Sequence, residues 1–180
     1  MNAEIAIAGS GGQGVLLIGR LLAEAGLLEG REVAWLPSYG AEKRGGTVWC
    51  NVTISDEKIG ALFIARPTAA IAMNPDSLGK LEPVMKPGGL LVINQSLVSS
   101  KVSRQDIRTV YVPANHLAGE LGNDSVGNLV TLGALTAGFP VVSKSSIMAV
   151  IDSMFSQNKG HLEINKQALS TGYAWGKGKS

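Results

Sequence analysis

The sequence predicts a three-layer α/β/α fold around a mainly parallel β-sheet, with a helical C-terminal third. Three observations lead to this prediction. Short apolar runs alternate with segments of helical apolar spacing, a glycine-rich turn joins the first such pair, and the chain beyond residue 126 shows mainly helical spacing. Strands and helices that alternate at these lengths are typical of a doubly wound sheet. The 180 residues suffice for one domain, and no linker or internal repeat divides them.

The first third of the chain predicts strands on either side of one helix. A buried strand is expected at 5–8, a helix at 15–26, a second strand at 31–36 and a third at 47–54. The helix follows from apolar residues that recur every three or four positions, and the third strand from its β-branched and aromatic residues. Pro37 is expected to end the second strand.

The remaining elements are read from the same signals. Asn74, Pro75 and Asp76 supply an N-cap, a first-turn proline and an early acid, so a helix is expected from there to about Met85. Further strands are expected at 69–73, 90–93 and 109–112, and further helices at 126–137, 145–155 and 164–175.

The turn after the first strand carries the strongest functional signal. Gly9, Gly11 and Gly14 satisfy the pattern G-x-G-x-x-G between a predicted strand and a predicted helix, which is typical of Rossmann-like domains. Glycines let the backbone approach a ligand closely, and the free N–H groups at a helix N-terminus favour an anion. The turn therefore indicates a phosphate-bearing ligand, or else glycines that only permit a tight turn and close helix–sheet packing.

A nicotinamide dinucleotide is the less favoured ligand of this turn. Its ribose requires an acid near the end of the second strand, and that strand reads Ala34-Trp35-Leu36-Pro37. Glu29 and Glu32 precede or open the strand instead of ending it. The nucleotide-binding and purely structural interpretations of the turn both remain open at this point.

A second polar loop follows the second strand and is expected at the same carboxyl edge of the sheet. It contains Ser38, Tyr39, Gly40, Arg44 and Gly45. Ligands of open α/β sheets bind at that edge, and the guanidinium of Arg44 offers a bidentate fork to phosphate or carboxylate. The alternative is that these side chains pack or contact another subunit.

Composition excludes several classes of protein. The net charge is +2, basic residues form no block, and no segment reaches about 18 apolar residues, so neither nucleic acid nor a membrane is an expected partner. Cys50 is the single cysteine, which excludes an internal disulfide and a cluster held by four thiolates. No metal site is expected, and His116 and His161 lack catalytic neighbours in the sequence. The chain is expected to be cytoplasmic.

The two loops together resemble the gamma-type domain of 2-oxoacid:ferredoxin oxidoreductases, the pyruvate and 2-oxoglutarate ferredoxin/flavodoxin oxidoreductase family. In that family G-x-G-G-Q-G is followed by P-x-Y-G-x-E-x-R-G-G, which is matched here by residues 9–14 and 37–46. Later matches are Asn74-Pro75 with Leu78, Pro87-Gly88-Gly89 with Asn94, and Asn128 with Leu132 and Gly133. The resemblance covers nearly the whole chain and implies a single gamma-type domain at 1–180.

The resemblance implies a multi-subunit enzyme that oxidatively decarboxylates a 2-oxoacid with coenzyme A to an acyl-CoA. Electrons pass through thiamine diphosphate and 4Fe-4S clusters to ferredoxin or flavodoxin. Those groups lie on partner subunits of alpha, beta and delta type, so this chain carries no catalytic residue and is inactive when isolated. A separate gamma chain of this size favours 2-oxoglutarate slightly over pyruvate.

The resemblance also implies that this chain supports assembly and helps to bind coenzyme A. The implied contacts are backbone and amide groups of Gly9, Ser10, Gly11, Gly12, Gln13 and Gly14, with Arg44 as the charged partner and Ser38, Tyr39, Gly40 and Gly45 nearby. The alternatives are a free-standing Rossmann-type enzyme that uses NAD or S-adenosylmethionine, and a pure scaffold subunit. A homodimer is the alternative to a monomer for the isolated chain.

Overall fold

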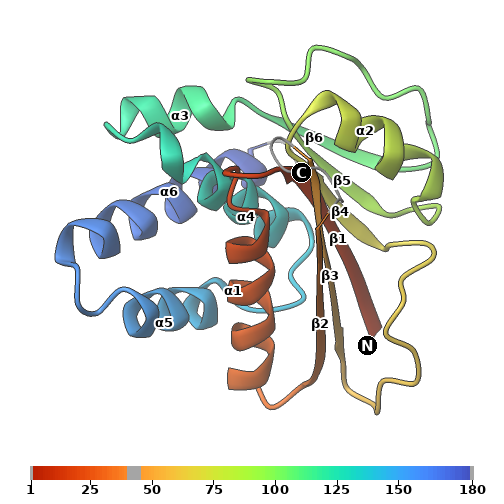
Figure 1. Cartoon of the computed structure of the whole chain (residues 1–180), viewed down its shortest axis with the longest axis horizontal. Coiled ribbons are helices and arrows are strands. Elements are labelled where there is room, and N and C mark those ends of the chain that lie inside the picture. Colours follow the sequence, from red (N-terminus) through yellow and green to blue (C-terminus); the bar gives the residue numbers. More distant parts are fainter. Residues whose placement is uncertain (1, 40–45, 179–180) are drawn as a thin grey trace.

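A computed structural model describes residues 2–39 and 46–178, and these contain a six-stranded sheet in the order β2-β3-β1-β4-β5-β6 (Figure 1). The strands are β1 (Asn2–Ser10), β2 (Glu32–Tyr39), β3 (Thr47–Ser55), β4 (Ala69–Ala72), β5 (Leu90–Asn94) and β6 (Arg108–Val112). The helices are α1 (Val15–Leu28), α2 (Pro75–Leu81), α3 (Ala114–Glu120), α4 (Gly127–Gly138), α5 (Lys144–Met154) and α6 (Lys159–Lys177), with short 3-10 turns η1 (Glu82–Val84) and η2 (Asp124–Val126).

The sheet is mainly parallel in direction, as the sequence predicts. Strands β1, β4, β5 and β6 pair in parallel, whereas β3 is antiparallel to both β1 and β2. Five of the six strands therefore run the same way. The second predicted strand does not lie beside the first, because β3 pairs with β1 along nine residues, from Asn2 opposite Ser55 to Ser10 opposite Thr47.

The second strand also runs further than the sequence predicts. Pro37 does not end it, and β2 continues to Tyr39, with Pro37 opposite Cys50 of β3. Proline lacks an N–H, so a sheet tolerates it on an edge strand, where the missing donor belongs to the unpaired side. Strand β2 is such an edge. Ser38 and Tyr39 consequently lie in the sheet instead of in a loop.

The two faces of the sheet are covered very unequally. Helices α1, α4, α5 and α6, together with α3, pack on one face, and α2 with the turn after it packs on the other (Figure 1). The second face is built from Ala6, Ala8, Ala70 and Ala72, small side chains that let α2 approach closely. Because α2 has only seven residues, part of this face over β2 and β3 stays open.

The helical C-terminal third is confirmed and centres on a close contact between α4 and α6. A Cβ atom added to Gly172 of α6 would overlap the carbonyl oxygen of Val130 in α4, and one added to Gly133 would lie 2.6 Å from the backbone nitrogen of Tyr173. The two backbones therefore touch where these glycines meet. Helix α3 was not separately predicted, because its seven residues are too short for a clear apolar period.

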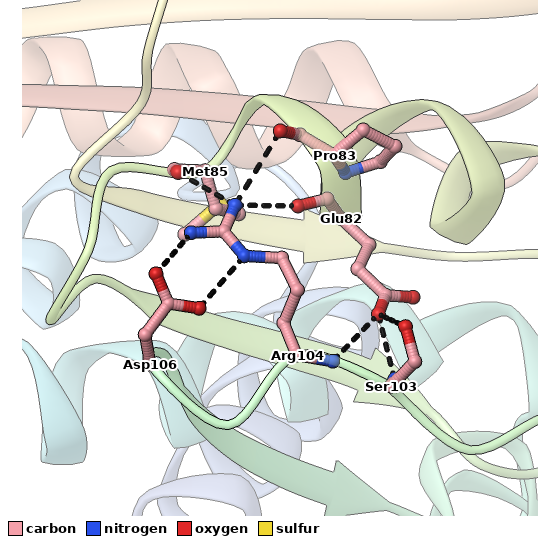
Figure 2. Close-up of polar contacts among 6 residues, drawn as sticks. All are labelled: Glu82, Pro83, Met85, Ser103, Arg104 and Asp106. Carbon is pink, nitrogen blue, oxygen red and sulfur yellow. Dashed lines mark hydrogen bonds and ion pairs between the residues drawn. The ribbon is translucent and has the colours of Figure 1, made fainter.

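The end of α2 is held by a cluster around Arg104 (Figure 2). The guanidinium of Arg104 donates to both carboxylate oxygens of Asp106, at 2.9 and 2.6 Å, and to the carbonyl oxygens of Glu82 and Met85, at 3.0 and 2.8 Å. One carboxylate oxygen of Glu82 in turn accepts from the backbone and hydroxyl of Ser103, each at 2.7 Å. The segment after β5 is thereby tied to the turn after α2.

Candidate functional site

The glycine turn joins β1 to α1 at the carboxyl edge of the sheet. Gly12 and Gly14 have φ angles of 88° and 71°, a left-handed conformation that favours glycine over other residues. Gly14 is the N-cap of α1, and among the described residues no side chain caps this helix and no acid lies in its first turn. The helix therefore presents backbone N–H groups at its start, which is a favourable place for an anion.

The four glycines of the turn have different surroundings. A Cβ on Gly9 would lie 2.7 Å from the amide oxygen of Gln13 and 2.9 Å from the Cβ of Met73, and one on Gly14 would overlap the amide of Asn128. Gly9 and Gly14 are thus required by close packing. Gly11 and Gly12 are exposed, with nothing within 4 Å of an added Cβ, so their side of the turn is open to a ligand.

Gln13 holds the turn in shape. Its amide oxygen accepts from the backbone N–H of Ser10 at 2.7 Å, and its amide nitrogen donates to the carbonyl oxygen of Met73, after β4, at 3.4 Å. Both ends of the amide are therefore engaged within the chain. Gln13 is better placed to position the turn than to contact a ligand through its amide.

Asn74 connects the turn to α2. Its amide nitrogen donates to the hydroxyl of Ser10 at 2.7 Å, and its amide oxygen accepts from the backbone and hydroxyl of Ser77, at 2.9 and 2.6 Å. The predicted N-cap is confirmed, and the same residue also fixes Ser10. The ends of β1 and β4 are in this way locked together through side-chain amides.

A small cavity of about 90 Å³ lies at this edge, next to Gly12 and Gln13. It is also lined by the amides of Asn94, Asn115 and Asn128. Asn94 is fully buried and donates to the amide oxygen of Asn115 at 2.8 Å. The cavity lies beside Met73, which follows β4, and Asn94, which ends β5, so it is at the carboxyl edge where open α/β sheets bind ligands.

These three asparagines were not predicted as site residues. Asn94 and Asn128 were noticed only as part of the family pattern, although a polar residue directly after the buried run of β5 is a signal in itself. Asn115 has no comparable local signal, because its position follows from the docking of α3. Amide groups offer both donors and acceptors, which suits recognition of polar ligand atoms.

The second predicted loop is only partly brought to this place. Ser38 and Tyr39 lie on β2, and the strand pleat directs them to opposite faces, with Ser38 on the α2 side and Tyr39 69% exposed on the other. Their register places both opposite β3, so β3 separates them from the glycine turn. Gly40, Arg44 and Gly45 lie outside the described residues.

The topology also bears on a dinucleotide. An NAD ribose needs an acid at the end of a strand beside β1. Here β3 occupies that position and runs the opposite way, so its carboxyl end lies at the far edge of the sheet. The only acid in β2 is Glu32, at its start. The sheet order therefore disfavours NAD for a second, independent reason.

The single cysteine of this sequence cannot supply the ligands of an iron–sulfur cluster. Cys50 is the single cysteine, and it is buried, with burial raising the pKa of its thiol to about 11 despite a hydrogen bond from the indole N–H of Trp35. Such a cluster needs about four thiolates. Within residues 2–39 and 46–178, no three His, Cys, Asp or Glu side chains gather closely enough to hold a metal ion.

The two histidines lie exposed on helices α3 and α6. His116 is exposed and lies 3.3 Å from the carboxylate of Glu120, one turn along α3, and His161 is exposed in the first turn of α6.

In the part of the chain that the structure describes, none of the helices combines the length and apolar character needed to cross a bilayer.

The chain matches a known protein family along nearly its whole length. Residues 4–175 match the family model described as pyruvate ferredoxin/flavodoxin oxidoreductase, and the chain belongs to that family. The resemblance drawn from the two loops is confirmed.

Among its relatives are subunits of archaeal oxidoreductases. The chain is 36% identical to the 2-oxoglutarate synthase subunit KorC of Methanocaldococcus jannaschii, covering 96% of this chain and 93% of KorC. It is 35% identical to the ketoisovalerate oxidoreductase subunit VorA of Methanothermobacter marburgensis, covering 96% of this chain and 36% of VorA. The chain therefore spans about a third of the length of VorA.

Solved structures confirm the fold. The gamma subunit of a keto/oxoacid ferredoxin oxidoreductase from Geobacter sulfurreducens superposes with a TM-score of 0.84 at 30% identity, covering 97% of this chain and 98% of the other. A 2-oxoglutarate:ferredoxin oxidoreductase from Magnetococcus marinus, with 2-oxoglutarate, coenzyme A and succinyl-CoA bound, superposes with a TM-score of 0.89 at 25% identity. The match covers 99% of this chain and 32% of that one.

Proposed function

We propose that this chain is the gamma subunit of a 2-oxoacid:ferredoxin oxidoreductase and that its glycine turn contributes to coenzyme A binding. The enzyme converts a 2-oxoacid and coenzyme A to an acyl-CoA and carbon dioxide, and the two electrons released reduce ferredoxin or flavodoxin. Thiamine diphosphate and the 4Fe-4S clusters belong to the alpha, beta and delta-type subunits. The single, buried thiol of Cys50 fits this division of labour.

The observation that carries the proposal is the open backbone at Gly11 and Gly12, directly before the uncapped start of α1. Coenzyme A carries a pyrophosphate, and a helix N-terminus with exposed N–H groups stabilises such a charge by about 0.3–1 kcal/mol, or more where water is partly excluded. Gln13 and Asn74 hold the turn rigid, so little ordering is required on binding.

In this proposal the chain binds and orients coenzyme A and performs no bond-making step. Holding the pyrophosphate fixes one end of a long, flexible molecule and raises the local concentration of its thiol at the catalytic subunits. Loss of the contact should therefore raise the KM for coenzyme A more than it lowers the turnover at saturation.

The 2-oxoacid is proposed to be 2-oxoglutarate in preference to pyruvate. The KorC relative, named for 2-oxoglutarate synthase, is 36% identical to this chain, whereas the pyruvate/ketoisovalerate oxidoreductases common subunit gamma of Thermococcus litoralis is 29% identical. The names of the relatives include both substrate classes, so the test is direct. Reduction of ferredoxin by the assembled enzyme should proceed at a higher kcat/KM with 2-oxoglutarate than with pyruvate or 2-oxoisovalerate.

Assembly is tested by affinity purification of the tagged chain from its native host without oxygen. A thiamine diphosphate-dependent subunit and an iron–sulfur protein are expected to co-purify in stoichiometric amounts. Recovery of the chain alone at native expression would contradict the subunit assignment and favour a free-standing nucleotide-binding enzyme.

The coenzyme A contact is tested by Gly11→Asp in the assembled enzyme. The new carboxylate would lie where the pyrophosphate is proposed, and like-charge repulsion is expected to raise the KM for coenzyme A at least about tenfold, or about 1.4 kcal/mol. Gly160→Asp is the control, because a Cβ on Gly160, in the first turn of α6, meets only an ordinary contact, 3.6 Å from the side-chain oxygen of Asn158. An unchanged KM in both variants, with assembly intact, would instead support a pure scaffold.

A further inference from the structure

A pocket of about 160 Å³, called here the helix pocket, lies on the face of the sheet opposite α2. Its walls come from the first turn of α1, the turn η2, the start of α4, the residue after α5 and the first turns of α6. These four helices lie together on that face (Figure 1). The volume is below the roughly 300–1,000 Å³ of small-molecule and cofactor sites, so the pocket suits a single side chain.

One buried polar group in the helix pocket has no partner. Asn165 of α6 lines the pocket and is only 6% exposed, and its side-chain amide forms no hydrogen bond within the described residues. Most buried side-chain amides in folded proteins have at least one partner, because an unpaired one costs free energy. Leucine has a similar shape and a higher helix propensity, so the isolated chain gives no reason for an asparagine at this place.

The other walls of the pocket suit a neutral group with apolar surroundings. His161 lies one turn before Asn165 on α6, so both side chains are on the same side of the helix. Leu17, Phe155 and Ile164, which are partly buried against the core, supply the apolar walls. Among the described residues that line the pocket there is no Lys, Arg, Asp or Glu. A side-chain amide offers a donor and an acceptor side by side, which matches the C=O and N–H of a peptide.

The position of the pocket indicates which peptide it meets. Ser125 and Asn128 line both the helix pocket and the small cavity beside Gly12. Coenzyme A held at the glycine turn must reach a reaction centre on another subunit, so the surface around the turn has to face that subunit. The helix pocket adjoins this surface and therefore lies where the two subunits meet.

We propose that the helix pocket binds an extended segment of the partner subunit that carries thiamine diphosphate, and that Asn165 bonds the backbone of that segment. This inference rests on the proposed function, because it specifies where the chain contacts the catalytic subunits. One apolar side chain of the segment packs against Leu17 and Phe155, and the C=O and N–H of the same residue meet the amide of Asn165. The amide that is unpaired in the free chain is thereby paired in the complex.

The test measures two properties of Asn165→Leu that a purely structural role would change together. In the isolated full chain, the unfolding temperature is expected to equal or exceed that of the parent, because the variant removes an unpaired amide. In the purified complex, the dissociation constant for this chain, measured by dilution and mass photometry, is expected to rise by about tenfold or more, because the backbone of the segment loses its partner. A lower unfolding temperature would show that Asn165 stabilises the chain itself and would overturn the proposal.

A second variant, His161→Trp, narrows the pocket with a larger side chain. His161 is exposed, so the fold is expected to persist, and the dissociation constant should again rise by about tenfold or more. Gln167→Leu and Gln167→Trp are the matched controls, because Gln167 is an exposed amide of the same helix that lies outside the pocket and donates to Glu163 at 3.0 Å. Both controls should keep the parent value. An unchanged dissociation constant in Asn165→Leu or His161→Trp overturns the proposal.

Other occupants of the pocket give different results. If Asn165→Leu raises the KM for coenzyme A or the 2-oxoacid while the complex stays intact, the pocket binds a small molecule and the proposal is overturned. If the variant only disrupts a dimer of the isolated chain, the occupant is a second copy and the proposal is likewise overturned.

Failure of this inference differs from failure of the proposed function. If the parent chain and Asn165→Leu co-purify equally tightly with the thiamine diphosphate-dependent subunit, the subunit assignment stands and the helix pocket is removed from the interface. If the parent chain itself is recovered alone, the proposed function fails, and this inference fails with it.

Discussion

Replacing Gly172 with alanine should destabilise the chain by separating α4 from α6. The new Cβ would overlap the carbonyl oxygen of Val130 and would lie 2.6 Å from its carbonyl carbon and 2.8 Å from its Cα. Carbon atoms in contact prefer about 3.5–4.0 Å, so the helices must part by roughly 1 Å. If the obstacle were a side chain, it could rotate away from the new Cβ. The obstacle here is the helix backbone at Val130, which cannot rotate away.

The size of the effect follows from two opposing contributions. Overpacking a core costs about 1–3 kcal/mol, and the upper value applies because the obstacle is backbone. Alanine in place of glycine within a helix returns about 1 kcal/mol. The net loss is therefore about 2 kcal/mol, which for a chain of this size corresponds to a decrease in Tm of roughly 4–8 °C.

Thermal and urea unfolding of the full chain, followed by circular dichroism, measures this difference. Gly160→Ala is the matched control, since the same substitution in the same helix meets only ordinary contact, 3.6 Å from the side-chain oxygen of Asn158. It should leave stability unchanged or increase it by up to about 1 kcal/mol. Equal unfolding midpoints for the two variants would refute the claim that the α4–α6 contact requires Gly172.

Two further predictions concern charge and reactivity. The hydrogen bond from Arg104 holds the pKa of Asp106 below its ordinary value, so the stability that Asp106 contributes is complete above about pH 4 and is lost as the pH falls through the lowered pKa. Asp106→Asn should therefore unfold at lower urea than the parent at pH 7 and at the same urea in strong acid, and a gap that persists in acid would contradict this cause. Burial raises the pKa of the Cys50 thiol to about 11, so iodoacetamide at pH 8 should label the chain rapidly in denaturing urea and very slowly without it. Equally fast labelling of the native chain would show that the thiol is accessible.

The features that local sequence determines were predictable. The glycine turn and the N-cap at Asn74 are signalled by a few consecutive residues, and both are found where the sequence places them. The order of the strands was not predictable from local sequence. Strand β3 lies between β1 and β2 because it pairs with β1, from which it is separated by dozens of residues in the chain. Pro37 misled for a related reason, since its cost depends on whether the strand lies at an edge.

The residues of the candidate site likewise fall into those that local sequence predicts and those that it does not. Gly11 and Gly12 could be chosen from the pattern alone, and their open surroundings agree with it. The amides of Asn115 and Asn128 reach the cavity beside the turn only after α3 and α4 have docked, so nothing in the nearby sequence predicts that they meet there. Lys80 likewise meets the start of β3 only in the folded chain, through a hydrogen bond to Thr47, 33 residues earlier.

The nine-residue ladder between β1 and β3 has a consequence for how the chain folds. Strand β1 is made first, yet its partner on one side ends at Ser55 and its partner on the other begins at Ala69. Strands β2 and β3 are consecutive and antiparallel, so they can zip together before β1 joins them. During synthesis the turn at Gly11 therefore waits for residues made later, and contacts of such long separation are slow to form. A nascent chain that stops short of Ser55 carries the whole glycine motif but lacks the complete strand that would hold it in place.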